Sequence, residues 1–154
     1  MKFSAQEEYG LRCLVAIGRK ESVTIPEVSR SEGLTEAHVA KLLMILRQGG
    51  FVTSTRGQTG GYALARPAEQ IAINEVLAHL GGRLYDAEFC GKHSGREDVC
   101  AHSFKCSIRS IWSTVQDAVD EVLDKISLAD IIRDEPAEKL ELAAAPPVGI
   151  RGRQ

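Results

Sequence analysis

The stretch that most limits how this chain can fold is the segment from Cys90 to Cys106, CGKHSGREDVCAHSFKC. It holds three of the chain's four cysteines, in the spacing C-x9-C-x5-C, together with His93 and His102. The segment has few apolar residues, so burial cannot offset the roughly 1–2 kcal/mol per residue that ordering its backbone costs. We therefore expect its thiols to order it, by binding a metal or by forming a disulfide.

The rest of the chain has an ordinary globular composition, 44% hydrophobic and 26% charged. The N-terminus lacks the apolar core of a signal peptide, and no run reaches the ~20 apolar residues that span a membrane. We expect a cytoplasmic protein with no membrane partner, in which thiols stay reduced and serve metal or redox chemistry. The net charge is −2, but residues 37–68 contain four basic residues and no acidic one, a modest indication of nucleic-acid binding.

The first fifty residues predict three helices, over residues 4–18, 27–32 and 36–48. Ser4 and Glu7 fit a capping box at the start of the first helix, and Thr35 is the expected N-cap of the third. Residues 23–25 are expected to form a short strand. Two short helices joined by a turn that contains Gly33, the second of them amphipathic, match a helix-turn-helix.

A β-hairpin is predicted directly after this helix pair. Residues 51–55 and 62–65 have the pattern of strands, and the loop between them, RGQTGG, is rich in glycine. This order is that of a winged helix-turn-helix. The expected DNA contacts lie at the start of the third helix and at the hairpin tip: Thr35, Glu36, His38, Lys41, Arg56, Gly57, Gln58, Thr59 and Gly60.

The second half of the chain predicts a helix over residues 71–80 and a long one over residues 108–126, whose apolar stripe must be buried. We expect this stripe to pair with a second copy of the chain. The fold class is thus mainly α with a small hairpin wing, a winged helix-turn-helix followed by a long C-terminal dimerisation helix. The expected regions are a DNA-binding domain (1–82), a cysteine-rich loop (83–107), the dimerisation helix with a short docking helix (108–132) and a flexible tail (133–154).

The three cysteines allow several kinds of site. Arg109 cannot be a ligand because its guanidinium stays protonated, so a metal site needs a fourth donor from elsewhere. Zinc would accept the three thiolates with His93 or His102, although the spacing lacks a C-x2–4-C pair. An iron–sulfur cluster would also accept them, and Cys100 with Cys106 would suit a redox-switched disulfide. We find no nucleophile–base pair or phosphate-binding motif, and we expect no enzymatic activity.

Four features together resemble a known family. They are MKFSAQEEYGLRCL, LTEAHVAKLLMILRQGGFVTSTRGQTGGYALARP, the three cysteines and IWSTVQDAVDEVLDKISLADI. Over residues 1–132 the chain resembles the Rrf family of winged-helix transcription regulators, which includes the iron–sulfur cluster regulator IscR and the nitric-oxide sensor NsrR. The resemblance implies a homodimer, double-stranded DNA with a palindromic operator as partner, and an iron–sulfur cluster, [2Fe–2S] or [4Fe–4S], that controls DNA affinity.

The chain departs from the family pattern at two places. The gap between the first two cysteines is longer than usual, and Arg109 stands where IscR-type members carry a histidine ligand. NsrR-like relatives instead use a carboxylate of the first helix, donated across the dimer, and the matching residue here is Glu8. The resemblance therefore implies Cys90, Cys100, Cys106 and Glu8 as cluster ligands, with Glu7, His93 and His102 as alternatives to Glu8. The competing hypothesis is a winged-helix protein that is stabilised by zinc or switched by a thiol–disulfide change.

Overall fold

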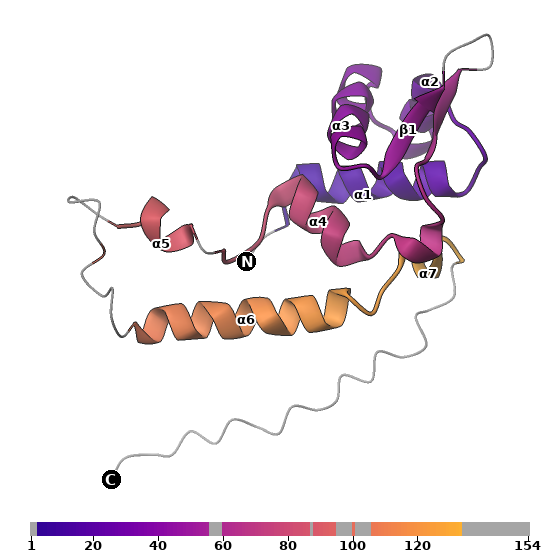
Figure 1. The fold of residues 1–154 in the computed structure, drawn as a ribbon. Coiled ribbons are helices and arrows are strands. Elements are labelled where there is room, and N and C mark those ends of the chain that lie inside the picture. The colour runs from indigo at the N-terminus through magenta and orange to yellow at the C-terminus, as the bar shows by residue number, and fades with distance from the viewer. Residues whose placement is uncertain (1–2, 56–59, 87, 95–99, 101–105, 134–154) are drawn as a thin grey trace.

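The structure is a computed structural model and describes residues 3–55, 60–86, 88–94, 100 and 106–133. Its elements follow one another as α1 (Ala5–Gly18), α2 (Ile25–Glu32), α3 (Glu36–Gln48), β1 (Val52–Thr55), β2 (Gly61–Leu64), the 3-10 turn η1 (Ala68–Gln70), α4 (Ile73–Gly81), α5 (Phe89–Lys92), α6 (Ser107–Leu123) and α7 (Leu128–Ile132). Figure 1 shows α1 to α4 and the hairpin gathered at one end, with α6 extending away below them. The predicted fold class, mainly helical with a hairpin wing, is confirmed.

The N-terminal helices begin and end at the residues that cap them. The Ser4 hydroxyl accepts the Glu7 N–H at 3.2 Å, and the Glu7 carboxylate accepts the Ser4 N–H at 2.7 Å, so the predicted capping box is present. Thr35 caps α3 as expected, accepting the His38 N–H at 3.3 Å. Gly33 ends α2 with a φ of 67°, a conformation that glycine adopts at little cost.

Helices α1 and α3 supply a large part of the hydrophobic core. Their inward faces are fully or almost fully buried, and Cys13 lies among them as a small apolar residue. Burial is the main cause that raises the pKa of the Cys13 thiol to about 11. This thiol therefore stays protonated at neutral pH and serves in packing.

The hairpin is anchored to the rest of the fold at its returning strand. Strands β1 and β2 pair antiparallel, from Val52↔Leu64 to Thr55↔Gly61. The strand expected at residues 23–25 is reduced to one bridge, Val23↔Tyr62, because Thr24 is used as the N-cap of α2. The wing is thereby attached to the turn that precedes the helix-turn-helix.

A second bridge, Ala72↔Ser127, joins the residue before α4 to the residue before α7. The Ile73 N–H donates to the Ile126 carbonyl at 2.9 Å, and the Leu128 N–H donates to the Ile71 carbonyl at 2.8 Å. Leu128, at the start of α7, is fully buried in the core. The bridge shortens both expected helices: α4 begins at Ile73 rather than at residue 71, and α6 ends at Leu123 rather than at residue 126.

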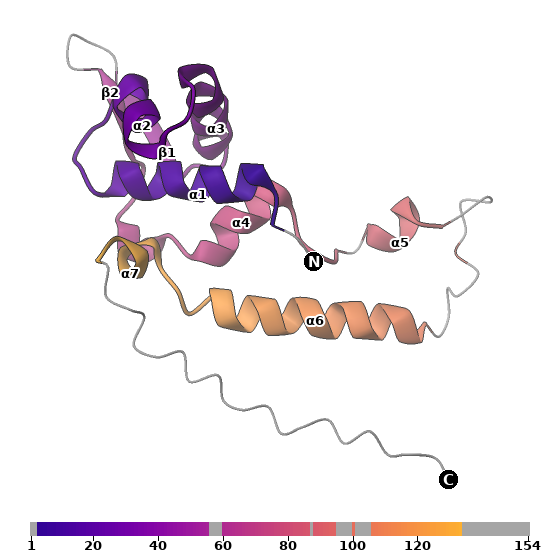
Figure 2. The same ribbon diagram turned by 180° about the vertical axis from the view of Figure 1, so that it is seen from behind.

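Figure 2 shows from behind that α5 and the start of α6 lie far from α3 and the hairpin. The four-residue helix α5 was not predicted, since it is too short to show a hydrophobic period. It carries Cys90. Within the described ranges, no helix is long and apolar enough to cross a membrane.

Candidate functional site

The start of α3 presents a polar, solvent-exposed surface. Thr35, Glu36 and Lys41 are all exposed, whereas Val39 and Leu42 point into the core. Arg47 extends the surface toward the hairpin, where its guanidinium donates to the Ser54 hydroxyl at 3.4 Å. Thr35, Glu36 and Lys41 are therefore accessible, and Arg47 adds an exposed basic side chain near the C-terminal end of α3.

His38 differs from its neighbours because it is held against α1. Its ring meets the Tyr9 ring edge-on, with centroids 5.5 Å apart. The Arg12 guanidinium also lies over the Tyr9 ring, 5.6 Å from its centroid, and Arg12 in turn pairs with Glu32 at 3.0 Å. His38 thus ties α3 to α1 and α2, and sequence reasoning missed this packing role because its partner lies in a different helix.

The tip of the wing, Arg56, Gly57, Gln58 and Thr59, lies outside the described residues, while Gly60 is described and half-buried. At the base of the tip the Thr55 hydroxyl accepts the Gly61 N–H at 3.2 Å and donates to the Gly61 carbonyl at 3.3 Å. These two bonds close the hairpin just below its glycine-rich loop. The predicted wing contacts at residues 56–59 stay predictions.

The cysteine site is formed where α5 approaches the start of α6. Cys90 lies in α5, and Cys106 is the N-cap of α6, where its sulfur accepts the Arg109 N–H at 3.4 Å. Cys90, Cys100 and Cys106 are half-buried free thiols. Cys90 and Cys106 both influence the pKa of Tyr85 and of Arg109, Cys90 more strongly than Cys106. Which of the predicted thiol ligands share one site stays a prediction.

The pKa values of Arg109 and Tyr85 both reflect the neighbouring Cys90. A side-chain hydrogen bond with Cys90 is the main cause that raises the pKa of Arg109, so this guanidinium stays protonated. Partial burial, and then the neighbouring Cys90, raises the pKa of Tyr85.

The candidates for the fourth ligand are placed differently. Glu8 is exposed on α1, while Glu7 is occupied by its capping box and packs against Gly81. His93 stacks on Phe89 with centroids 4.2 Å apart, and its Nδ1 lies 2.8 Å from the Phe89 carbonyl. His102 lies outside the described residues.

In the part of the chain that the structure describes, no three His, Cys, Asp or Glu side chains are grouped as a metal site. Within these described residues, the three thiols and Glu8 are therefore not assembled into one site. The residues still fit an iron–sulfur cluster chemically, because cysteines supply the thiolate ligands that such clusters use. Sequence reasoning missed Tyr85 and Phe89, the aromatic pair that flanks Cys90 with ring centroids 5.5 Å apart.

Comparisons with known proteins match most of the chain. The family model described as "Rrf2: Iron-dependent Transcriptional regulator" matches residues 3–134. The chain is 32% identical to the protein rrf2 of Nitratidesulfovibrio vulgaris, over 87% of this chain and 89% of that protein. It is 29% identical to the HTH-type transcriptional regulator NsrR of Bacillus licheniformis, over 88% of this chain and 94% of that protein.

Solved structures have the same fold. CymR, the global cysteine regulator of B. subtilis, superposes with a TM-score of 0.67 at 27% identity and covers 86% of this chain and 97% of its own. IscR of T. potens also superposes with a TM-score of 0.67, at 28% identity, and covers 87% of this chain and 88% of its own.

Proposed function

This chain belongs to the Rrf2 family of transcriptional regulators, and from that premise we propose that an iron–sulfur cluster on its cysteine segment controls how tightly it binds operator DNA. The family consists of transcriptional regulators and not of enzymes. The observation that supports the proposal is the set of three free thiols, with Cys106 as the N-cap of α6 and Cys90 as the main influence on the pKa of Arg109 in the first turn of that helix. The bound cluster would supply a centre that responds to redox state, to nitric oxide or to iron supply.

We propose that DNA is bound by α3 and the wing. The exposed first turns of α3, with Thr35, Glu36 and Lys41, would enter the major groove, and Arg56 would contact the backbone or the minor groove. Because much of the affinity then comes from phosphate contacts, operator binding should fall steeply as salt rises.

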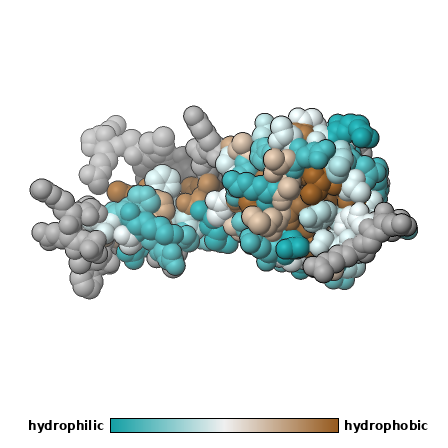
Figure 3. Space-filling view, turned by 90° about the horizontal axis from the view of Figure 1, so that it is seen from above, coloured by the Kyte–Doolittle hydropathy of each residue, from teal (hydrophilic) through white to brown (hydrophobic). Residues whose placement is uncertain are grey.

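We propose a homodimer formed through α6. Ile108, Ile111 and Trp112 are 56%, 58% and 45% exposed, and they lie on one stripe of this helix. Seen from above, the extended end of the molecule shows hydrophobic side chains among hydrophilic ones (Figure 3). A stripe of this size is unfavourable in water, and a second copy would cover it. Two-fold symmetry predicts a palindromic operator and lets Glu8 of one copy complete the cysteine site of the other.

In this arrangement the residues of the chain have separate tasks. Cys90, Cys100 and Cys106 hold the group, and Glu8, exposed on α1, supplies the fourth donor. Arg109 compensates the negative charge of the thiolates. Because a carboxylate is a weaker ligand for iron than a thiolate, a site with one carboxylate is labile, which suits a sensor.

A second candidate is a thiol–disulfide switch or a structural zinc site. The observation that favours it is that Cys90, Cys100 and Cys106 are free thiols, and neither of these alternatives needs iron or Glu8. The two candidates differ in what the purified protein contains.

The deciding experiment is purification without oxygen, followed by visible absorption and by assays of iron, sulfide and zinc on one sample. Brown protein with stoichiometric iron and sulfide supports the cluster, and loss of colour in Glu8→Ala but not in Glu7→Gln would support Glu8 as the fourth ligand. Colourless protein that contains zinc, or protein that stays metal-free after anaerobic reconstitution, would reject the cluster in favour of the second candidate.

A further inference from the structure

Gln116, in the middle of α6, is the one polar side chain that is buried in the described part of the chain, with 5% of its surface exposed. Its amide lies between two fixed partners. Its Oε1 accepts the Tyr85 N–H at 3.0 Å, and its Nε2 donates to Asp120 Oδ1 at 2.7 Å. A backbone N–H requires an acceptor and a carboxylate requires a donor, so these partners determine which way the amide points.

On one side, Gln116 is linked to the cysteine site. The Tyr85 ring packs on Phe89, the neighbour of Cys90 in α5, with ring centroids 5.5 Å apart. A displacement of Cys90 would therefore move Tyr85, and with it the N–H that Gln116 accepts.

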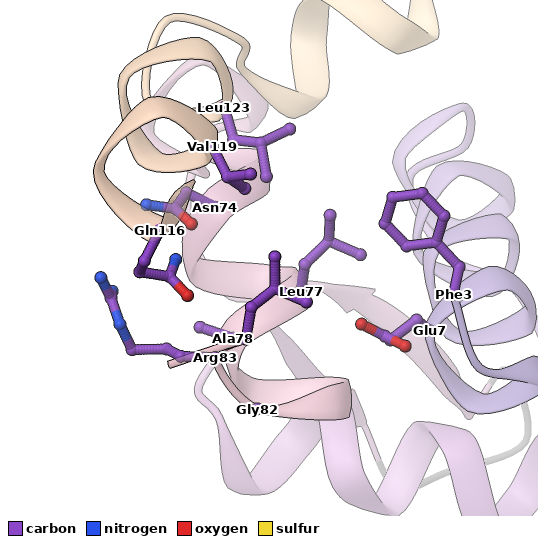
Figure 4. A pocket seen from close by; sticks show the side chains of 11 residues that line it. Phe3, Glu7, Asn74, Leu77, Ala78, Gly82, Arg83, Gln116, Val119 and Leu123 are labelled. Atoms are coloured by element: carbon purple, nitrogen blue, oxygen red, sulfur yellow. The ribbon is translucent and has the colours of Figure 1, made fainter. Parts of the chain in front are cut away.

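On the other side, Gln116 is linked to α4. Asp120 pairs with Arg83, which follows the end of α4, and the Asn74 amide of α4 donates to Asp124 Oδ1 at 2.7 Å, one turn farther along α6. Figure 4 shows Gln116 reaching from α6 into the space between Asn74 and Arg83. This cluster of polar side chains joins α6 to α4.

Helix α4 in turn holds the recognition helix. The Nε2 of His79 lies 2.9 Å from the Ile45 carbonyl of α3, and the His79 ring packs edge-on against Phe51. Continuous contacts thus run from the cysteine site through Gln116 and α4 to α3.

We propose that Gln116 is the positioning residue that couples the state of the cysteine site to the orientation of α3. The inference rests on the proposed cluster control. When the cysteine segment rearranges and Tyr85 withdraws its N–H, the buried Gln116 amide loses a partner, which is unfavourable. Gln116 and Asp120 then form hydrogen bonds with other partners. As a result, α6 moves relative to α4 and to α3, which α4 supports.

The test compares operator affinities of the cluster-loaded and cluster-free dimer, by fluorescence anisotropy, in wild type and in Gln116→Met. Methionine keeps the length of the side chain but neither hydrogen bond. We expect cluster content, helicity and dimerisation to be unchanged, while the ratio of the two affinities falls about 5-fold or more, the lower end of typical allosteric couplings. Asp117→Asn, an exposed neighbour on α6, is the matched control and keeps the wild-type ratio.

Hydrogen exchange at the Tyr85 amide supplies a second readout, and it should be faster in Gln116→Met than in Asp117→Asn. Should the methionine variant fail to fold, Gln116→Glu retains the acceptor for Tyr85 and sets a carboxylate against Asp120, and the same fall in the ratio is expected. A retained ratio, an equal loss in Asp117→Asn, or loss of the cluster itself would overturn the role of Gln116. A wild-type protein that carries a cluster but binds DNA equally in both states would overturn the proposed function, and this inference with it.

Discussion

Replacing Gly61 by alanine tests how the wing is attached to the domain. Gly61 opens β2, and a Cβ built there would meet the Ser22 hydroxyl at 2.5 Å and the Val23 carbonyl oxygen at 2.8 Å. Gly61 is not among the glycines with positive φ, so the expected penalty is steric and involves no backbone strain. The Ser22 side chain can rotate away, whereas the Val23 carbonyl cannot move without lengthening its 2.7 Å bond from the Tyr62 N–H.

The magnitude follows from the bridge. Val23 and Tyr62 exchange two hydrogen bonds, of 2.9 and 2.7 Å, and each contributes about 0.5–1.5 kcal/mol. Loss of both predicts that Gly61→Ala lowers the free energy of unfolding by about 1–3 kcal/mol, the usual cost of overpacking. Operator affinity should fall as well, since the wing loses its fixed position beside α2.

Urea unfolding of Gly61→Ala, Ser22→Ala and the double variant provides the assay. We expect Ser22→Ala to restore only a small part of the loss, because the backbone obstacle stays. Full recovery in the double variant would mean that the Ser22 side chain was the obstacle. Gly61→Ala with wild-type stability would refute the argument from close approach altogether.

Three further predictions concern the DNA surface, the dimer and the α6 network. Lys41→Gln and Arg56→Ala should each weaken operator binding for all sequences and reduce the slope of log affinity against log salt by about 0.9 for each phosphate that the variant no longer neutralises; Lys92→Gln on α5 should leave that slope unchanged. Ile111→Glu should yield a monomer in sedimentation velocity, because it places a charge in the exposed stripe of α6, while Asp117→Asn should stay dimeric. The third prediction concerns Asp120. Desolvation by burial tends to raise the pKa of its carboxyl, but hydrogen bonds from Gln116 and Arg83 outweigh that effect and lower the pKa. The ionised Asp120 carboxylate therefore stabilises the fold above its unfolded-state pKa of about 3.9, and this stabilisation is lost as pH falls through the lower folded-state pKa. The difference in unfolding free energy between wild type and Asp120→Asn should thus shrink between pH 7 and pH 3.

The helices and the hairpin could be predicted because their signals are local. Ser4 with Glu7, and Thr35, mark helix starts by bonds to residues three positions away, and Gly33 marks a helix end by its own φ. The two bridges could not be predicted in this way. Ala72 meets Ser127 across a long stretch of chain, and this contact decides where α4 begins and α6 ends.

The sequence singled out candidate residues for the cysteine site and the DNA surface, but it does not show how these residues are arranged in space. Spacing singled out the cysteines, and Arg109 was excluded as a ligand by its chemistry, but nothing local placed Arg109 beside Cys90. Likewise, the sequence gives no sign that the His38 ring packs on Tyr9, and the DNA contact expected of His38 stays a prediction. Gln116 has the appearance of an ordinary polar residue on a helix, and only the fold shows that it is buried between two partners.

The Ala72↔Ser127 bridge also has a consequence for how members of such a lineage diverge in length. The bridge joins the residue before α4 to the residue before α7, so the cysteine segment lies inside a closed loop whose two ends the bridge holds. Doubling the length of a flexible loop costs only about 0.6 kcal/mol. Residues can thus be inserted between Cys90 and Cys100 almost without loss of stability, so the spacing of the thiols is free to be selected for chemistry alone.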